Sequence, residues 1–434
     1  MAAASPHVVI VGGGFAGLSA ASLLARKGVA VTIVDKSNHH TFQPFLYQVA
    51  TAGLSPGEIA APIRTILKSY RNVSVVLGEV TGFDTANRRV LLPDTTVSYD
   101  YLLIAAGASH SYFGHDEWAT LAPGLKTIED ALEIRRRILL AFELAENQAR
   151  KTGSHDPIHI AIVGGGPTGV ELAGTLAEVT RRTLASDFRY LDPGKAQITL
   201  IEGESRVLPA YPPELSRWAQ QKLEQLGVRV LLSARVTAVE AGRLRVGECY
   251  EPATVTIWAA GVAASPLGKL LGAPTRRNGS VPVAPDLSVP GLKNVFVAGD
   301  LAYFIATPDG KPLPGLAPVA IQEGRAVARN ILRDLRGEAR QNFRYLDKGT
   351  MAVIGRAAAI ADIRGLHVTG FFAWLLWLFV HILYLVGFRN RVLVLLEWAW
   401  SYFTYQRSAR LIYGDLHLPG FSDGRESAAE RRVS

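Results

Sequence analysis

Short apolar runs alternate along the chain with longer segments in which apolar residues recur every three or four positions. The first runs lie at 7–11 and 29–35, and a similar pair lies at 159–163 and 197–202. Continuous β-branched runs of this length are typical of strands buried on both faces, and the segments between them have the period of helices. The pattern predicts an α/β fold in which one strand–helix–strand unit occurs twice.

The first strand leads directly into the glycine-rich turn GGGFAG. Gly12 permits a tight turn, Gly14 lets phosphate oxygens approach the backbone, and Gly17 lets the next helix pack closely on the strand. The N-terminus of that helix offers free N–H groups to a pyrophosphate. Asp35 ends the second strand near the usual spacing of about 20 residues, where it can accept hydrogen bonds from ribose hydroxyls. These features predict a dinucleotide site.

The turn GGGPTG repeats this arrangement with Gly164, Gly166 and Gly169. The following strand ends in Glu202, later than usual, because a predicted helix extension and polar loop are inserted at 181–195. A carboxylate here favours NAD over NADP, since it would repel a 2′-phosphate. One such fingerprint fits an ordinary strand-to-helix turn, but two, each with strand, helix and terminal acid, predict that the chain binds two nucleotides.

A later strand, 294–302, ends in Gly299 and Asp300, where the glycine allows close approach and the carboxylate can bind a sugar hydroxyl. An amphipathic helix follows, with Gln322 and Glu323 near its start. The N-terminus of this helix is predicted to point at the polar edge of a cofactor.

Composition narrows the class of protein. The chain has 434 residues, enough for two or three domains, and a formal net charge of +8. The basic residues are scattered and no base-reading module is visible, so an anionic membrane surface explains the charge better than nucleic acid does. The single cysteine, Cys249, excludes a redox dithiol. No charged leader precedes the first strand, so we expect the catalytic body to stay cytoplasmic.

The tail predicts membrane attachment. Residues 370–388 are almost wholly apolar, with His381 as the one polar residue, and this stretch of about 20 residues is long enough to span hydrocarbon. The stretch 392–406 adds aromatic residues followed by Arg407 and Arg410, a composition that suits the headgroup zone. A transmembrane helix, a buried core helix and an in-plane helix pair all stay open on this pattern. We expect His381 to be a tolerated residue of helix packing.

Several segments together carry a more specific resemblance. They are GGGFAGL, NHHTFQPFLYQVATAGLSP at 38–56, GGGPTGVELAG, VFVAGDLA, APVAIQEG and the apolar tail. With these segments the chain resembles the flavoproteins with two dinucleotide-binding domains, and within them the bacterial type II NADH:quinone oxidoreductases. The resemblance implies two Rossmann-like domains, for FAD and NADH, plus a C-terminal membrane-binding helical region. It favours the in-plane helix pair, and it implies a possible homodimer.

The resemblance also implies residue roles. FAD would be bound by Gly12, Gly14, Gly17, Asp35, Val80, Gly299 and Asp300. NADH would be bound by Gly164, Gly166, Gly169 and Glu202. Glu171 and Gln322 would lie where nicotinamide, flavin and quinone meet, with Tyr47 and Gln48 as weaker candidates. A purely structural role is the alternative for Glu171 and Gln322. Relatives often carry lysine before the tail, so whether His367 takes that role is open. No metal site is expected.

The expected domains are an FAD-binding domain at 1–123 and 287–346, an NADH-binding domain at 124–286, and a membrane-anchoring region at 347–434. A helix predicted over 128–151 would link the domains and carry Arg135–Arg137 on a solvated face. The polar end of the chain, 422–434, is predicted to be disordered.

The pattern and the resemblance predict a membrane-associated respiratory-chain flavoenzyme that passes two electrons from NADH through FAD to a membrane quinone without pumping protons. The flavin would supply the redox chemistry, and the protein would supply orientation and a path for the quinone. Two alternatives are a reductase of a soluble electron-carrier protein and a low-turnover flavin- and NADH-binding membrane sensor. The expected location is the cytoplasmic face of the plasma membrane.

Overall fold

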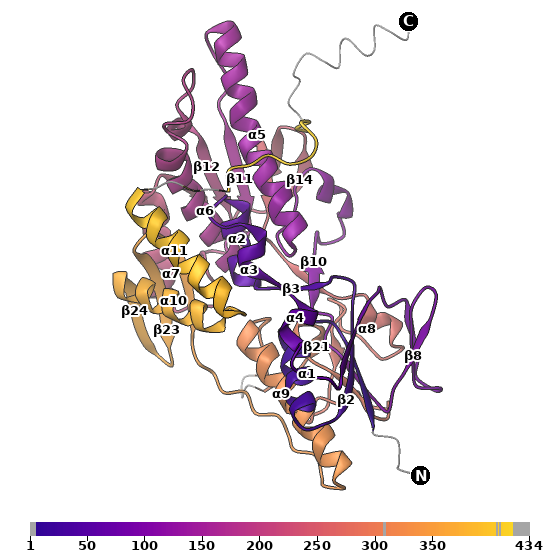
Figure 1. Ribbon diagram of the computed structural model, residues 1–434. Helices are drawn as coiled ribbons and strands as arrows, with labels where there is room; N and C mark the ends of the chain where they lie inside the picture. The colour runs from indigo at the N-terminus through magenta and orange to yellow at the C-terminus, as the bar shows by residue number, and fades with distance from the viewer. Residues whose placement is uncertain (1–5, 307–309, 405–406, 408, 420–434) are drawn as a thin grey trace, which may run out of the picture. The chain divides into compact units, whose positions relative to one another are not determined.

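The computed structural model describes residues 6–306, 310–404, 407 and 409–419, so the predicted disorder at 422–434 lies outside the described residues. Contacts divide the chain (Figure 1) into two compact units. Unit 1 comprises Met1–Thr41, Ala60–Ser109 and Val262–Lys348. Unit 2 comprises Phe42–Ile59, His110–Gly261 and Gly349–Ser434. These units divide the chain at other points than the expected domains, whose boundaries stay a prediction.

Unit 1 is built on a five-stranded parallel sheet in the order β20-β9-β1-β2-β5. Its strands are β1 (His7–Val11), β2 (Ala30–Asp35), β5 (Val73–Leu77), β9 (Tyr101–Ile104) and β20 (Val295–Val297). β1 lies between β9 and β2, so the strand order reverses beside the first glycine turn. Ligands of open α/β sheets bind at such a point, beyond the carboxyl ends of the strands.

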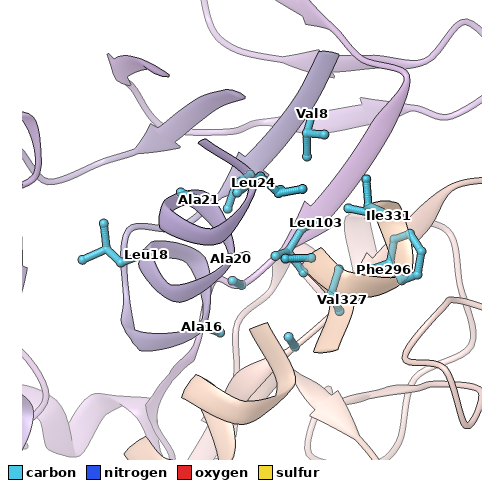
Figure 2. Close-up of a cluster of buried hydrophobic side chains, with 14 of the residues drawn as sticks. Val8, Ala16, Leu18, Ala20, Ala21, Leu24, Leu103, Phe296, Val327 and Ile331 are labelled. Carbon is cyan, nitrogen blue, oxygen red and sulfur yellow. The ribbon is translucent and has the colours of Figure 1, made fainter. Parts of the chain in front are cut away.

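Helices α1 (Phe15–Arg26) and α9 (Ala317–Leu335) pack closely in unit 1. Figure 2 shows how side chains of these helices and the neighbouring strands gather into one buried cluster. The close approach needs Gly324, because a Cβ there would collide with the carbonyl oxygen of Ala16. Forcing extra atoms into such a contact costs about 1–3 kcal/mol. Helix α1, which follows the glycine turn, is therefore held between α9 and the strands of the sheet.

Smaller elements complete unit 1. They are the antiparallel strands β6 (Gly82–Asp84), β7 (Arg89–Leu91) and β8 (Thr96–Ser98), the pair β3 (His39–Thr41) and β4 (Ala60–Pro62), helices α4 (Ile63–Leu67) and α8 (Leu267–Leu270), and the pair β19 (Val281–Pro282) and β21 (Ala302–Tyr303).

Unit 2 repeats the parallel arrangement with four strands in the order β13-β12-β11-β17. Its strands are β11 (His159–Val163), β12 (Gln197–Ile201), β13 (Val228–Leu231) and β17 (Val255–Trp258). The accompanying elements are helices α5 (Ile128–Thr152), α6 (Pro167–Glu178) and α7 (Pro213–Gln225) and the antiparallel strands β14 (Val236–Glu240), β15 (Arg243–Val246) and β16 (Cys249–Pro252). The predicted α/β fold with two Rossmann-like halves is confirmed.

The insertion before Glu202 has the predicted form. A π-helical turn, Val179–Thr183, extends α6, and a polar 3₁₀ turn, Pro193–Lys195, precedes β12. The Asp192 carboxylate accepts a hydrogen bond from the Gly194 N–H and so closes that turn. The long spacing between the last glycine and Glu202 therefore leaves the strand order of the sheet unchanged.

The prediction of a solvated face at Arg135–Arg137 is wrong. Arg135 is 3% exposed, beneath the ring of Tyr413, and Arg137 donates hydrogen bonds to the carbonyl oxygens of Thr120 and Leu121. Arg136 donates to the carbonyl oxygens of two residues of 409–419. We call residues 409–419 the C-terminal strap. The arginines are covered because this strap, distant in sequence, packs along α5.

The tail forms two helices after a small antiparallel sheet. The sheet contains β22 (Thr350–Gly355), β23 (Ala358–Ile363) and β24 (Leu366–Gly370), and the helices are α10 (Phe371–Tyr384) and α11 (Phe388–Thr404). The apolar stretch at 370–388 is thus broken after Tyr384. Among the described residues, none of the helices is long and apolar enough to cross a membrane.

Candidate functional site

The first glycine turn in unit 1 has the shape that a bound pyrophosphate requires. Gly12 has φ +104°, a conformation that side chains rarely adopt, and a Cβ there would strike the carbonyl group of Ala105. A Cβ on Gly17 would collide with the carbonyl oxygen of Gly12. At Gly14, by contrast, a Cβ would meet nothing within 4 Å. The turn is therefore tightly packed on its protein side and open where phosphate oxygens would approach.

Asp35 is bound to this turn. Its carboxylate accepts hydrogen bonds from the Gly13 N–H at 2.6 Å and the Ser37 N–H at 2.7 Å. His40 also belongs to the turn, since its Nδ1 lies 3.1 Å from the Gly13 carbonyl oxygen and its ring meets Phe15 edge-on at 4.9 Å. Burial lowers the pKa of His40 to about 4, so the ring is neutral at neutral pH. Sequence reasoning missed His40, because only the packing shows that it contacts the turn.

A second part of unit 1 holds Asp300. The Gly299 N–H donates a hydrogen bond of 2.6 Å to the carboxyl group of Glu323, which is 2% exposed. Burial, with a further contribution from the charge of Asp300, raises the pKa of Glu323 to about 8. Glu323 is thus protonated at neutral pH. Its function is to hold the backbone beside Asp300.

Two other predicted residues of unit 1 have mainly internal contacts. Val80 is buried in the hydrophobic cluster that also contains Val34 of β2. Gln322 uses both ends of its amide on Leu346, donating to its carbonyl oxygen and accepting from its N–H, each at 3.0 Å. These contacts favour a structural contribution from Gln322, which was the alternative interpretation of the sequence.

The second glycine turn, in unit 2, repeats the first. Gly164 has φ +110°, and a Cβ on Gly169 would collide with the carbonyl oxygen of Gly164, whereas Gly166 faces open space. Glu202 accepts a hydrogen bond from the Gly165 N–H, as Asp35 does in the first turn, and another from the Glu204 N–H at 2.8 Å. Each turn is therefore closed by the acid at the end of the following strand.

Unit 2 also contains a buried polar chain. Helix α2 (Leu46–Ala50) carries Tyr47 and Gln48, and the Gln48 amide donates to the Tyr47 hydroxyl at 3.0 Å. The Gln48 carbonyl oxygen accepts from the indole N–H of Trp398 on α11 at 2.8 Å. Burial and repulsion from Glu171 raise the pKa of Tyr47 well above its ordinary value. The two weaker candidates of the sequence thus lie together, near Glu171.

Glu171 follows the second glycine turn on α6. The Val353 N–H approaches its carboxyl group at 3.5 Å. Although part of the Glu171 side chain is accessible, protein atoms crowd the carboxyl group and raise its pKa to about 8. A carboxyl group of this kind is protonated at neutral pH and can release its proton to a neighbour.

A cavity lies entirely within unit 2, between α6, β22 and the two tail helices, with a volume of about 120 Å³. Its polar lining comes from Tyr47, Gln48, Glu178, Arg356 and Arg407. Its aromatic lining comes from Trp374, Trp377, Trp398 and Tyr402. Arg407, expected in the headgroup zone, instead lies in the cavity wall. The cavity combines the flat aromatic surfaces and sparse polar groups that suit a planar organic ligand.

Two histidines of the tail region, His381 and His367, have different surroundings. His381 stacks on Trp377 at 4.2 Å, and its Nδ1 lies 2.8 Å from the Trp377 carbonyl oxygen. Burial lowers the pKa of His381 to about 4, so it is a neutral residue of helix packing, as expected. His367 lies on β24, where its Nδ1 approaches the Glu214 carboxylate at 2.7 Å. Its ring thus contacts a carboxylate at the surface of the protein.

Comparison with known proteins covers almost the whole chain. Residues 6–324 match the family described as pyridine nucleotide-disulphide oxidoreductase, and residues 348–406 match the NDH2 C-terminal domain. A type II NADH:quinone oxidoreductase of Mycobacterium tuberculosis is 44% identical over 433 residues, which cover 94% of this chain and 91% of the relative. A type II NADH:quinone oxidoreductase of Staphylococcus aureus is 30% identical over 379 residues, which cover 85% and 92%.

A solved structure supports the same fold. The structure of NDH2 from Plasmodium falciparum in complex with NADH has a TM-score of 0.83 at 21% identity, covering 95% of this chain and all (100%) of that chain. The disulphide in the first family's description has no counterpart here, because the chain has one cysteine.

Proposed function

The chain belongs to the pyridine nucleotide-disulphide oxidoreductases and, within them, to the type II NADH:quinone oxidoreductases, and on this premise we propose that it oxidises NADH and reduces a quinone through bound FAD. The observation that carries this function is the pair of glycine turns, each closed by its own carboxylate, in one chain with the C-terminal region of that family. A flavin accepts hydride from a nicotinamide and passes two electrons onward.

The residues of the first turn fit FAD. Gly12, Gly14 and Gly17 leave an open backbone surface for the pyrophosphate, Asp35 binds the adenosine ribose, and Asp300 binds the ribityl chain, while Glu323 holds its backbone. Val80 and Gly299 border the same FAD site. Gln322 supports it through Leu346. The second turn binds NADH in the same manner, with its glycines at the pyrophosphate and Glu202 at the ribose.

The cavity in unit 2 is the quinone site. Its aromatic walls suit a planar ring, and its polar groups suit the two quinone oxygens. Reduction converts NADH, one proton and a quinone into NAD⁺ and a quinol. Glu171 holds a proton at neutral pH close to Tyr47, a residue of the cavity wall, and so supplies it toward the quinone.

The exposed apolar surface of the tail favours a membrane quinone, rather than a soluble electron carrier, as the electron acceptor. Side chains of α10 and α11 expose large apolar surfaces, among them Phe372 at 75%, Phe388 at 81% and Phe403 at 80%. A soluble protein rarely exposes a contiguous apolar patch of this kind unless it binds a partner or a lipid surface. We therefore propose that the helix pair lies in the interfacial plane. We also propose, as a separate point, that the catalytic body lies on the cytoplasmic face.

Two finer points of this proposal have separate tests. Protease treatment of right-side-out and inverted vesicles distinguishes the two membrane faces, and protection in inverted vesicles would exclude the cytoplasmic one.

The homodimer rests on the family resemblance alone. Sedimentation of the detergent-solubilised protein measures it, and a monomeric mass would refute it.

The function itself is tested by stopped-flow absorbance at the flavin bands. Anaerobic NADH should bleach the bound flavin, and a short-chain quinone added afterwards should restore its absorbance rapidly. Bleaching without recovery would show that the acceptor is a protein rather than a quinone. Absence of bleaching would favour a low-turnover sensor.

The choice of coenzyme should depend on Glu202. In Glu202→Gln the carboxylate that repels a 2′-phosphate is removed, so the ratio of kcat/KM for NADH over NADPH should fall at least about tenfold. Initial rates with both coenzymes measure this ratio. Glu204→Gln is the matched control, because the Glu204 side chain is exposed next to the same strand end. An unchanged ratio in Glu202→Gln would refute the assignment.

Quinone reduction should fall as pH rises through about 8, because Glu171 then loses the proton that it supplies. Glu171→Gln should lower the rate about 100-fold or more and remove this step from the pH profile. The rate with ferricyanide, which takes electrons without protons, is the control in both proteins. A variant that keeps the wild-type pH profile would contradict the role of Glu171.

Membrane attachment should depend on the exposed phenylalanines of the tail. Replacing Phe372, Phe379 and Phe403 with serine should weaken binding to anionic liposomes at least about tenfold, since their partial burial in lipid is lost. Liposome flotation measures the bound fraction, and flavin content reports folding. The control replaces Phe113 and Leu346, which are exposed outside the tail. Equal binding of the two variants would exclude the helix pair as the anchor.

A further inference from the structure

Arg407 has an unusual position for a residue beyond the last tail helix. Its guanidinium Nη1 donates to the carbonyl oxygen of Thr51 at 3.2 Å and to the hydroxyl of the same residue at 3.3 Å. It also lies against Gly53, where a Cβ would be 3.0 Å from Nη1. A Cβ at 53 would shift the guanidinium by a few tenths of an ångström, so glycine there leaves room for Arg407 in the cavity wall.

The surroundings of Arg407 make it an unusual cation. Burial lowers the pKa of its guanidinium, and the charges of Glu178 and Tyr47 only partly compensate. The Glu178 carboxyl group in turn accepts from the Arg356 N–H at 2.6 Å, and its own pKa is raised by burial. Arg182 and Arg356 are the other charged groups near Glu178. The cavity wall thus holds a cation whose acidic neighbours offset its burial only in part.

The C-terminal strap fixes the chain directly after Arg407. Arg410 pairs with the Asp187 carboxylate at 2.6 Å and donates to the Thr183 carbonyl oxygen at 3.1 Å. Arg136 donates to strap carbonyl oxygens at 2.7 and 2.9 Å, and Leu418 is buried. Arg407 is therefore held between the end of α11 and a strap bound to α5, a restraint that a loose terminal segment would not provide.

We propose that Arg407 is a quinone-binding residue, whose guanidinium donates a hydrogen bond to the quinone oxygen that gains negative charge, and that the C-terminal strap positions it. This inference rests on the proposed function, in which NADH supplies the two electrons and one proton and a second proton completes the quinol. A planar guanidinium suits this role, because it stays charged in a low-dielectric cavity and presents several donors in one plane. A donor to a developing oxyanion is worth most where water is excluded.

The test uses the full-length, FAD-loaded protein and two substitutions. R407M keeps the length of the side chain but removes its charge and donors, and R407K keeps the charge without the planar fork. With a short-chain quinone, R407M should lower kcat/KM about 100-fold and R407K about tenfold, with a loss in kcat as well as in KM. Flavin reduction by NADH and turnover with ferricyanide should keep their wild-type rates, because neither uses a quinone oxygen.

Arg389→Met is the matched control. It removes one exposed cation at the start of α11, outside the cavity, and should leave quinone kinetics unchanged. The inference is overturned if wild type reduces the quinone and R407M does so equally well, or if R407M slows flavin reduction and ferricyanide turnover to the same extent. Failure of the proposed function is a different result, since then the wild-type flavin would bleach without being reoxidised by the quinone.

The positioning role of the strap has its own test. R136Q combined with D187N removes bonds to the strap outside the cavity, and should raise the quinone KM several-fold with the ferricyanide rate unchanged. Adding these two substitutions to R407M should produce no further loss, because residues that act as one unit show non-additive effects. If the loss of kcat/KM in the combined variant equals the product of the losses in the two separate variants, positioning of Arg407 by the strap is overturned.

Discussion

The hydrogen bond from a glycine-turn N–H to the acid at the next strand end is the constraint on which both nucleotide sites depend. Asp35 makes it with Gly13, and Glu202 makes it with Gly165. It can form only if strand, turn, helix and second strand are in register, so a single bond reports the geometry of a whole half of the fold. It also leaves each acid beside the turn, where the ribose of a bound dinucleotide would lie.

The sequence predicts this geometry well because every part of it is local. Strand runs, glycines and terminal acids lie within a few tens of residues, and even the longer path to Glu202 only inserts two turns. Arg135 and Arg407 were misjudged for the opposite reason. Each acquires its role through a contact with a distant segment, and the bond between Trp398 and Gln48 joins residues 350 apart. A periodic pattern carries no information about such contacts.

Buried ionisable groups divide into two kinds in this chain. Glu323 and Glu171 both have a pKa raised to about 8 by burial, so each is neutral at neutral pH and costs little to enclose. Arg407 keeps its charge, since even a lowered guanidinium pKa stays far above neutrality. A neutral acid serves to hold backbone or supply a proton, whereas an enclosed cation serves to attract negative charge. Burial therefore has opposite effects on the two residue types: the buried acids become neutral and can donate a proton, whereas the buried arginine stays charged.

The proposed membrane attachment would place the tail helices between two different environments, which would explain both their composition and the difficulty of predicting their form. Outer side chains such as Phe372 and Phe403 are exposed and would contact lipid, whereas Trp377 and Trp398 face the protein and line the cavity. Hydropathy adds these two kinds of side chain together and so suggests a single span. A helix that is apolar on all sides because it lies between lipid and protein can be short, as α10 is with 14 residues. The same arrangement would let a lipid-soluble quinone reach the aromatic wall without crossing water, so anchoring and substrate access follow from one structural feature.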